Sequence, residues 1–262
     1  MTVYDIYSFI DKIAPFNLTM DFDNTGLLIG DFSAEVSAVV LALDCTSDVL
    51  NFALQKNANL IITHHPVIFN PIKKVCADSI VYQLIRHNIN VISAHTNLDI
   101  AKGGVNDCLA RKLDLHNISG LSVLTSSDFK DNSIVSHETL GRIGYLNSPM
   151  SAKDFADFIK SKLNGTSIRY TDGHKLISKV AICGGSGDSE LHSAMALGAD
   201  ALVTGEVKHH LFVEASNSNF SLFEAGHFFT EDVVLDYLSD SLSQNFKDIS
   251  FFVSHDSFVL NA

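Results

Sequence analysis

The chain has 262 residues, of which 46% are hydrophobic and 18% charged, a composition typical of a globular protein with a substantial core. Its net charge is −12 and Lys and Arg never occur in runs longer than two, so we expect no binding to nucleic acid or an anionic membrane. The first residues lack the pattern of a signal peptide, and no apolar segment is long enough to span a bilayer. The four cysteines occur singly, without the spacing of disulfide or thiolate zinc sites, so we predict a cytoplasmic protein.

The first half of the chain alternates predicted strands and helices. A helix is predicted over 3–14, where Pro15 ends it, and a turn within 22–30 leads into a short strand. Continuous apolar runs, typical of strands buried on both faces, follow at 37–44, 59–66 and 90–95. Helices are predicted after them, at 46–56, 79–88 and 105–113. This order predicts a parallel sheet with helices on its faces.

The second half repeats this order with similar local sequences. The matching pairs are AVVLALDCTSDVL (38–50) with KVAICGGSGDSEL (179–191), NANLIITHH (57–65) with GADALVTGE (198–206), and NVISAHTNLD (90–99) with SLFEAGHFFTE (221–231). We therefore predict an α/β protein of two similar lobes, each with a mainly parallel sheet flanked by helices, related by internal duplication. The first lobe is assigned to 1–125, completed by 232–262, and the second to 126–231, with a junction rich in strands and turns near 115–150.

Histidines and carboxylates gather where the predicted strands end. Because parallel strands deliver their carboxyl ends to one edge of a sheet, where ligands bind, we expect these side chains to form a site. Imidazole and carboxylate ligands without thiolate suit Zn, Fe, Mn, Co or Ni, and two such ions about 3.5–4 Å apart could activate a water molecule and polarise an electrophile. We predict a two-metal site made by five residues, each where a strand runs out into a loop: His64, His65, Asp99, His227 and Glu231.

Further polar residues near these strand ends are candidates for proton transfer, namely Glu206, His210 and His95. His95 either ligates a metal or forms a hydrogen bond to a ligand or substrate, and we favour the second role. Other histidines are interpreted as ordinary surface or core residues: His87, His116, His137, His174, His192 and His255.

Two turns leave alternatives open. The glycine-rich turn at 184–187 either cradles a phosphate or is a tight connection between a strand and a helix. Asp23, Asn24 and Gly26 fit a structural turn, and a role in the wall of the site is the less favoured alternative.

Several motifs together resemble the Nif-three-like family, whose bacterial members are commonly labelled GTP cyclohydrolase I type 2 homologues. In chain order they are DNTGLLIG, THHP, HTNLD, GRIG, VAICGGSG, GADALVTGEVKHH and AGHFFTE. The resemblance implies a two-lobed α/β subunit with a dinuclear metal site between the lobes. It also implies a ring-shaped homohexamer, a trimer of dimers whose sites face an internal cavity. By position, His64, Asp99 and Glu231 look like ligands of one metal, and His65, His227 and a bridging Glu231 like ligands of the other.

The resemblance implies chemistry at a metal site but does not identify the substrate. Longer relatives carry a domain inserted between the lobes, and this chain has no room for it near 115–150. There is no P-loop for a triphosphate, and the nearby lysines are few: Lys73, Lys74, Lys102 and Lys208. We predict a metal-dependent hydrolase of a small molecule, with a nucleotide or related heterocycle as one candidate. The alternatives are a non-catalytic metal-binding scaffold, trafficking or regulatory protein, and a metal-free fold with chance histidines.

Overall fold

The computed structural model describes residues 1–130, 137–165 and 167–259, which fall into two compact units. Unit 1 comprises the described residues of Met1–Lys102, Ser126–Val135 and Leu235–Asp256. Unit 2 comprises those of Gly103–Thr125, Ser136–Val234 and Ser257–Ala262. Among the described residues, no helix is both long enough and apolar enough to cross a membrane.

Unit 1 is built on a five-stranded sheet with the order β1-β4-β3-β2-β11. Its strands are β1 (Gly26–Ile29), β2 (Ala38–Ala42), β3 (Leu60–Thr63), β4 (Asn90–Ser93) and β11 (Ser250–Val253). Strands β2, β3, β4 and β11 run parallel, whereas β1 pairs antiparallel with β4. Every residue of β2, β3 and β4 is buried, which explains why these strands are mainly apolar.

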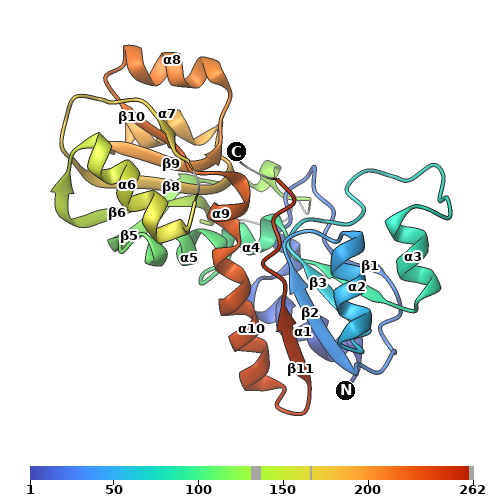
Figure 1. Cartoon of the computed structure of the whole chain (residues 1–262). Helices are drawn as coiled ribbons and strands as arrows, with labels where there is room; N and C mark the ends of the chain where they lie inside the picture. Colours follow the sequence, from blue (N-terminus) through green and yellow to red (C-terminus); the bar gives the residue numbers. More distant parts are fainter. Residues whose placement is uncertain (131–136, 166, 260–262) are drawn as a thin grey trace. The chain divides into compact units, whose positions relative to one another are not determined.

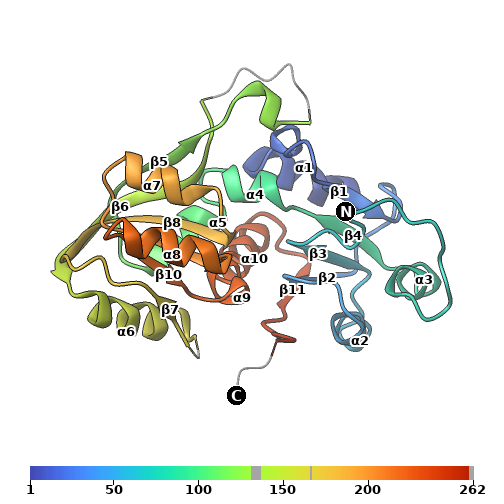
Figure 2. The same ribbon diagram turned by 90° about the horizontal axis from the view of Figure 1, so that it is seen from above.

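Helices cover both faces of this sheet. They are α1 (Val3–Ile13), α2 (Ser47–Gln55), α3 (Ile80–Arg86), α4 (Thr96–Ile100) and α10 (Val233–Asn245), with short 3-10 turns η1 (Phe16–Leu18) and η2 (Ser126–Asp128). Figure 2 shows α2 and α3 on one face and α1 and α10 on the other. Helices α2 and α3 are capped at their N-termini by Thr46 and Ser79, whose hydroxyl oxygens accept hydrogen bonds from the first turn. Leu50 and Leu84 then pack against Val40 and Ile61 of the sheet.

Unit 2 is built on a six-stranded sheet with the order β5-β6-β8-β9-β10-β7. Its strands are β5 (His116–Val123), β6 (Thr139–Met150), β7 (Arg169–Tyr170), β8 (Ile177–Ser186), β9 (Ala201–Glu206) and β10 (Ser221–Glu224). Only β8, β9 and β10 run parallel to one another among these described strands. The sheet is mixed, where the sequence predicted a mainly parallel one, because β5, β6 and β7 join it antiparallel at its edges.

Two apolar clusters hold the helices of unit 2 on opposite faces of the sheet. Helices α5 (Val105–Lys112), α6 (Ala152–Leu163) and α9 (His227–Glu231) lie on one face, and α7 (Glu190–Ala196) and α8 (His209–Asn217) on the other (Figure 1). On the first face, Phe155 and Ile159 of α6 pack with Val180 and Val203. On the second, Leu191 and Leu211 pack with Leu202. Alternate residues of the parallel strands therefore face different helix layers.

The two units repeat one succession of elements. Each has a helix, an antiparallel edge strand, and three parallel strands that are each followed by a helix: α1-β1-β2-α2-β3-α3-β4-α4 and α6-β7-β8-α7-β9-α8-β10-α9. In each unit the edge strand pairs with the last of the three parallel strands. This shared topology supports the internal duplication inferred from the sequence.

The structure divides the chain differently from the predicted lobes 1–125 and 126–231. Residues 103–125 belong to unit 2, because β5 pairs with β6 and α5 packs on β6 and β8. The segment from Leu235 belongs to unit 1, where β11 pairs with β2. The junction near 115–150 is thus largely two strands of the second sheet, apart from residues 131–136, which lie outside the described part of the chain.

A carboxyl group is buried at the start of α7. The Glu190 side chain is 3% exposed and accepts hydrogen bonds from the hydroxyl groups of Ser122 and Ser189. Burial raises the pKa of Glu190, against the opposing effect of the two hydroxyl groups. A carboxyl group with a raised pKa in the folded state contributes stability below its unfolded pKa and loses it as the pH rises through the folded value.

Replacement of Glu190 by Gln should therefore stabilise the protein at alkaline pH, because the amide carries no charge to bury. We expect a gain in Tm of about 2 °C near pH 8 that disappears by about pH 4, measured by differential scanning calorimetry. Glu214→Gln is the matched control, since Glu214 is an exposed residue of unit 2 that pairs with His192. A lower Tm for Glu190→Gln at both pH values would contradict the prediction.

Candidate metal centre

Three histidines of unit 1 come together beyond the carboxyl ends of β3 and β4. His64 and His65 directly follow β3, and His95 precedes the first turn of α4. One ring nitrogen of each lies within 4.8 Å of those of the other two. Their ring centroids are 5.0–5.6 Å apart. The strand ends therefore place three imidazoles close enough to share a small ligand or an ion.

Each of the three imidazole rings is fixed through its Nδ1 atom. The Nδ1 atom lies 2.9 Å from an oxygen in every case: the Ala94 carbonyl for His64, Asp44 Oδ1 for His65, and Asp23 Oδ1 for His95. Because carbonyl and ionised carboxylate oxygens only accept hydrogen bonds, these partners assign the proton to Nδ1 and leave a lone pair on Nε2. Metal-ligating histidines are commonly oriented in this way.

The backbone explains how neighbouring strands supply His65 and its partner. Beyond β3 the chain stays paired with the segment that follows β2, since His64 N donates to Ala42 O and His65 N donates to Leu43 O. Asp44 is the next residue of that segment, so its carboxylate reaches the His65 ring. His64 is 1% exposed, whereas His65 is half-buried.

Asp99 adds a carboxylate to the imidazoles of unit 1. Its Oδ1 lies 3.6 Å from His64 Nε2, and its side chain is largely buried. Asp99 was expected in a loop, but it lies in the short helix α4, where its N–H donates to the carbonyl of His95. This turn brings the carboxylate back towards the end of β3. Unit 1 alone thus offers both imidazole and carboxylate ligands.

Asp23 holds His95 in place from a distant part of the sequence. Asp23 Oδ1 contacts His95 Nδ1, and Oδ2 accepts from the Thr96 N–H (3.1 Å) and hydroxyl (2.6 Å). Burial by itself would raise the pKa of Asp23, but the hydrogen bond and charge of His95 and the two Thr96 donors outweigh it and lower the pKa to about 2. Asp23 therefore stays ionised. Its contacts support a role in the wall of the site, which was the less favoured of its two predicted roles.

Unit 2 places His227 and Glu231 on one side of α9, four residues apart. His227 Nε2 lies 3.1 Å from Glu231 Oε2, and His227 Nδ1 lies 3.2 Å from Glu206 Oε1. The Glu231 side chain is 4% exposed. His227 thus has an oxygen partner on Nδ1, as the three histidines of unit 1 do. Glu206, predicted as a proton-transfer group, contacts the ring of a predicted metal ligand.

The glycine-rich turn at 184–187, where β8 ends, makes room for the carboxylate of Glu231. A Cβ atom on Gly185 would collide with the Glu231 carboxylate, and Gly185 has a φ of +61°. Two N–H groups of the turn are engaged, since Gly184 donates to Asn106 Oδ1 (2.9 Å) and Gly185 to Thr230 Oγ1 (3.1 Å). Of the two alternatives for this turn, these contacts favour a tight connection over a phosphate cradle.

The repeated His-x3-acid pattern does not occupy strictly equivalent positions in the two units. His95 is the second residue after β4, whereas His227 is the third after β10. The additional residue is Gly226, which has a φ of +90° and precedes α9 as His95 precedes α4. Counted from the helix start, Glu231 lies one residue, or about 100° of rotation, beyond the position of Asp99.

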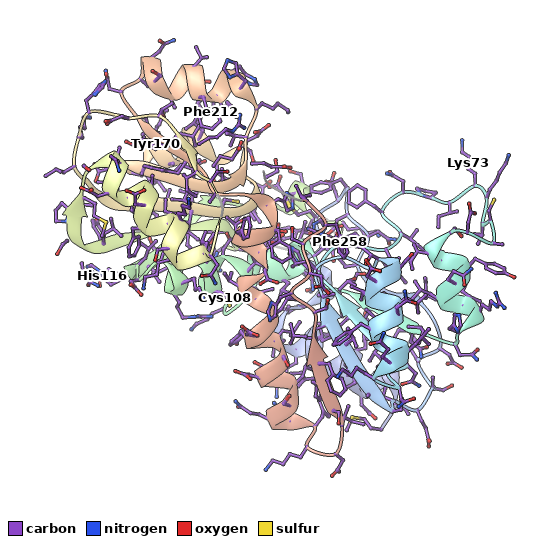
Figure 3. The ribbon with its side chains drawn as sticks, in the orientation of Figure 1. Lys73, Cys108, His116, Tyr170, Phe212 and Phe258 are labelled. Atoms are coloured by element: carbon purple, nitrogen blue, oxygen red, sulfur yellow. The ribbon has the colours of Figure 1, made fainter. Side chains whose placement is uncertain are left out.

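His210 does not join these groups among the residues that the structure describes. It lies in the first turn of α8, and its electrostatic partner is Asp188. The histidines interpreted as ordinary lie elsewhere: His87 at the end of α3, His116 at the start of β5 (Figure 3), His137 before β6, and His174, His192 and His255 beside surface carboxylates.

Asp44 was not singled out from the sequence, although a signal was present. It ends the apolar run at 37–44, and the rule that identified His64 and His65 also applies to it. The role of Asp23 had no comparable signal, since its partner His95 is 72 residues away in the chain.

The ligand types in these groups suit a divalent transition metal. Imidazole and carboxylate groups are offered without thiolate, and Cys45, which follows Asp44, has a pKa raised to about 12 by burial and by the charge of Asp44. The space that Gly185 leaves for Glu231 is consistent with a site that a larger side chain would disrupt. The residues therefore fit metal ions.

Known proteins resemble the chain over nearly its whole length. Residues 1–257 match the family model described as Duf34/NIF3 (NGG1p interacting factor 3). A Clostridium acetobutylicum protein named GTP cyclohydrolase 1 type 2 homolog is 38% identical, over 88% of this chain and 85% of that protein. A Clostridium perfringens protein of the same name is 35% identical, over 98% and 97%. A Staphylococcus aureus hypothetical protein of solved structure is 32% identical, with a TM-score of 0.90 and coverage of 100% and 99%. The chain belongs to the DUF34/NIF3 family.

Proposed function

We propose that the chain binds two divalent transition-metal ions, of Zn, Fe, Mn, Co or Ni, and hydrolyses a small molecule. His64, Asp99 and Glu231 would hold one ion, and His65, His227 and a bridging Glu231 the other. The observation that carries this proposal is the oxygen partner on Nδ1 of every proposed histidine ligand, which presents Nε2 for coordination.

The residues around the proposed ligands suit proton transfer. When bound, two divalent ions would supply Lewis acidity and lower the pKa of coordinated water. The His95 Nδ1 atom donates its proton to Asp23, which remains ionised because its pKa is low. His95 Nε2 can therefore accept a proton and return it to a leaving group. Glu206 Oε1 lies 3.2 Å from His227 Nδ1 and can accept a proton from that side of the ring.

The substrate is proposed only as a small molecule. The names of the curated relatives make ring opening of a guanine nucleotide one candidate reaction. Recognition of a triphosphate has little support, because Lys208 is engaged with Asp188 at 3.0 Å and the N–H groups of Gly184 and Gly185 are occupied. Lys73 and Lys74 are exposed on the loop after β3.

Asp44→Asn tests whether the oxygen partner on Nδ1 prepares a histidine to bind metal, because the neutral amide accepts more weakly from His65 Nδ1. Elemental analysis should find about two ions in the wild type. Metal titration of the variant should give an affinity for one of the ions that is roughly 10- to 100-fold weaker. Asp48→Asn on the exposed first turn of α2 is the control and should bind as the wild type does. Equal affinity in Asp44→Asn and wild type would remove the support.

A turnover panel separates hydrolysis from the alternative of a non-catalytic metal-binding scaffold. Metal-loaded wild type should act on at least one class among nucleotides, esters and amides. Tight binding of metal with no turnover in any class would instead favour the scaffold.

We also propose the homohexamer, a trimer of dimers, that the family resemblance implies. The edge strand β5 supports self-association, because Ile118 and Val123 are 38% and 71% exposed on it. Light scattering should give a mass about six times the 28.6 kDa of one chain.

A further inference from the structure

Two exposed phenylalanine rings lie beside His95 in unit 1. Phe22 is 58% exposed and Phe69 is 44% exposed. Their ring centroids are 6.5 Å apart with planes tilted by 52°. The Phe69 ring is 6.4 Å from the ring of His95, at an interplanar angle of 81°. An apolar surface thus adjoins the cluster of imidazoles.

Hydrogen bonds hold the segments that carry these rings. Asn24 Nδ2 donates to the Ile68 carbonyl at 2.6 Å, which joins the residues beside Phe22 to the residue before Phe69. Asp23, which lies between Phe22 and Asn24 in the chain, contacts His95 through its carboxylate. The Asp23 N–H donates to Met20 O. Ile68 also packs against the apolar cluster under β3. The rings are therefore presented on a fixed turn, and their exposure is not that of a loose chain end.

Two exposed aromatic rings beside a cluster of imidazoles are typical of a surface that binds a ligand. Two aromatic side chains left in water forgo the burial that stabilises others in the core. Small-molecule sites characteristically combine apolar and aromatic walls with a few polar groups, and here the polar group beside the rings is the partly exposed imidazole of His95. The surface lies where the proposed function needs a substrate to be positioned.

The surroundings of the rings select the kind of ligand. Among the described residues, the hydrogen bonds of this turn join Asn24 to the Ile68 carbonyl, and Thr96 and His95 to the acidic Asp23; of these side chains only His95 can carry a positive charge. Figure 3 shows Lys73, on the same loop as Phe69, at the outer edge of unit 1 with its side chain directed to solvent. A ligand here is recognised by an uncharged face and not by a phosphate.

We propose that Phe22 and Phe69 form a stacking surface for an uncharged aromatic or heteroaromatic ring, which they hold beside His95. Planar rings stack on aromatic side chains with offset or tilted geometry and need no fixed charge. This inference rests on the proposed function, because it assigns the substrate of that site to planar ring compounds. Phe22 and Phe69 become specificity-determining residues.

Binding of small ring compounds tests the proposal directly. Saturation-transfer NMR and calorimetry would be carried out on the full chain with guanosine, adenosine and nicotinamide, and with ribose 5-phosphate as a phosphate without a ring. At least one ring compound should bind, and Phe69→Leu and Phe22→Leu should each weaken it by about tenfold. Ribose 5-phosphate should not compete. Phe32→Leu is the matched control, because Phe32 is a 41% exposed phenylalanine of unit 1 that contacts Tyr4 and Tyr7.

Three outcomes would overturn the stacking proposal. They are no binding of any ring compound, equal binding by Phe69→Leu and wild type, and a change of oligomeric mass in the Phe22 and Phe69 variants without a change in ring binding. The last would mean that the rings serve contacts between copies of the chain. Metal content is measured in parallel and should be unchanged in all three variants. Ring binding without metal would contradict the proposed function alone, and metal without ring binding would contradict the stacking surface alone.

Discussion

Replacing Glu231 with Gln should reduce the bound metal from about two ions per chain to about one or fewer. Glu231 is proposed to bridge both ions, and an amide offers one weaker oxygen without the negative charge. Affinity should fall by more than about 100-fold, measured by elemental analysis after dialysis against a chelator buffer. Hydrolysis should be lost with the metal.

The same substitution, Glu231→Gln, should not lower the unfolding temperature of the metal-free protein. The Glu231 side chain is 4% exposed, and removing a buried charge lowers the cost of desolvation. Metal-free Glu231→Gln should therefore unfold at a temperature equal to or above that of metal-free wild type. Glu214→Gln, an exposed change in the same unit, should leave both metal and Tm unchanged. Full retention of both ions by Glu231→Gln would contradict the ligand assignment.

Replacing Gly185 with Ala should abolish metal binding through the Glu231 side chain. The new methyl group would occupy the place of the Glu231 carboxylate and lie 3.3 Å from His227 Nε2. Glu231 must then turn away or the turn must shift. A further cost of about 1–2 kcal/mol comes from placing Ala at the φ of +61°. Calorimetric metal titration and chemical unfolding measure the two effects.

Gly198→Ala separates backbone strain from the collision. Gly198 has a φ of +68°, close to that of Gly185, but a Cβ there meets nothing within 4 Å. Gly198→Ala should lose about 1–2 kcal/mol of stability and bind metal as the wild type does. If both variants lost stability and metal to the same extent, strain alone would explain the result and the role assigned to Gly185 would be wrong.

The strands were predictable because burial on both faces forces a continuous apolar sequence. The runs at 37–44, 59–66 and 90–95 correspond to β2, β3 and β4, with ends that differ by at most three residues. The helices α4 and α9 were missed, because five residues such as HFFTE are too few to show a helical period. The boundary at 125 differed because α5 and β5 follow the first repeat without a break, and only their pairing with β6 and β8 assigns them to unit 2.

The candidate site was predictable as far as strand ends could locate it. His64 and His65 follow from that rule, and so does Asp44. The contact of Asp23 with His95 depends on how a turn folds back over α4, which no local pattern reports. The one-residue offset from Gly226 was also hidden, because His-x3-Asp and His-x3-Glu look alike when written as letters.

The order of the segments along the chain has a consequence for synthesis on the ribosome. Unit 1 needs β11 beside β2 and most of α10 on its sheet, yet both lie beyond residue 232, after most of unit 2. During translation, β2 must wait with one edge unpaired while more than half of the chain is made, and unpaired edges invite aggregation. Unit 2 has its whole sheet once β10 has emerged. The sheet whose strands are made first is therefore completed last, and a nascent chain stalled near residue 230 would be the form most dependent on chaperones.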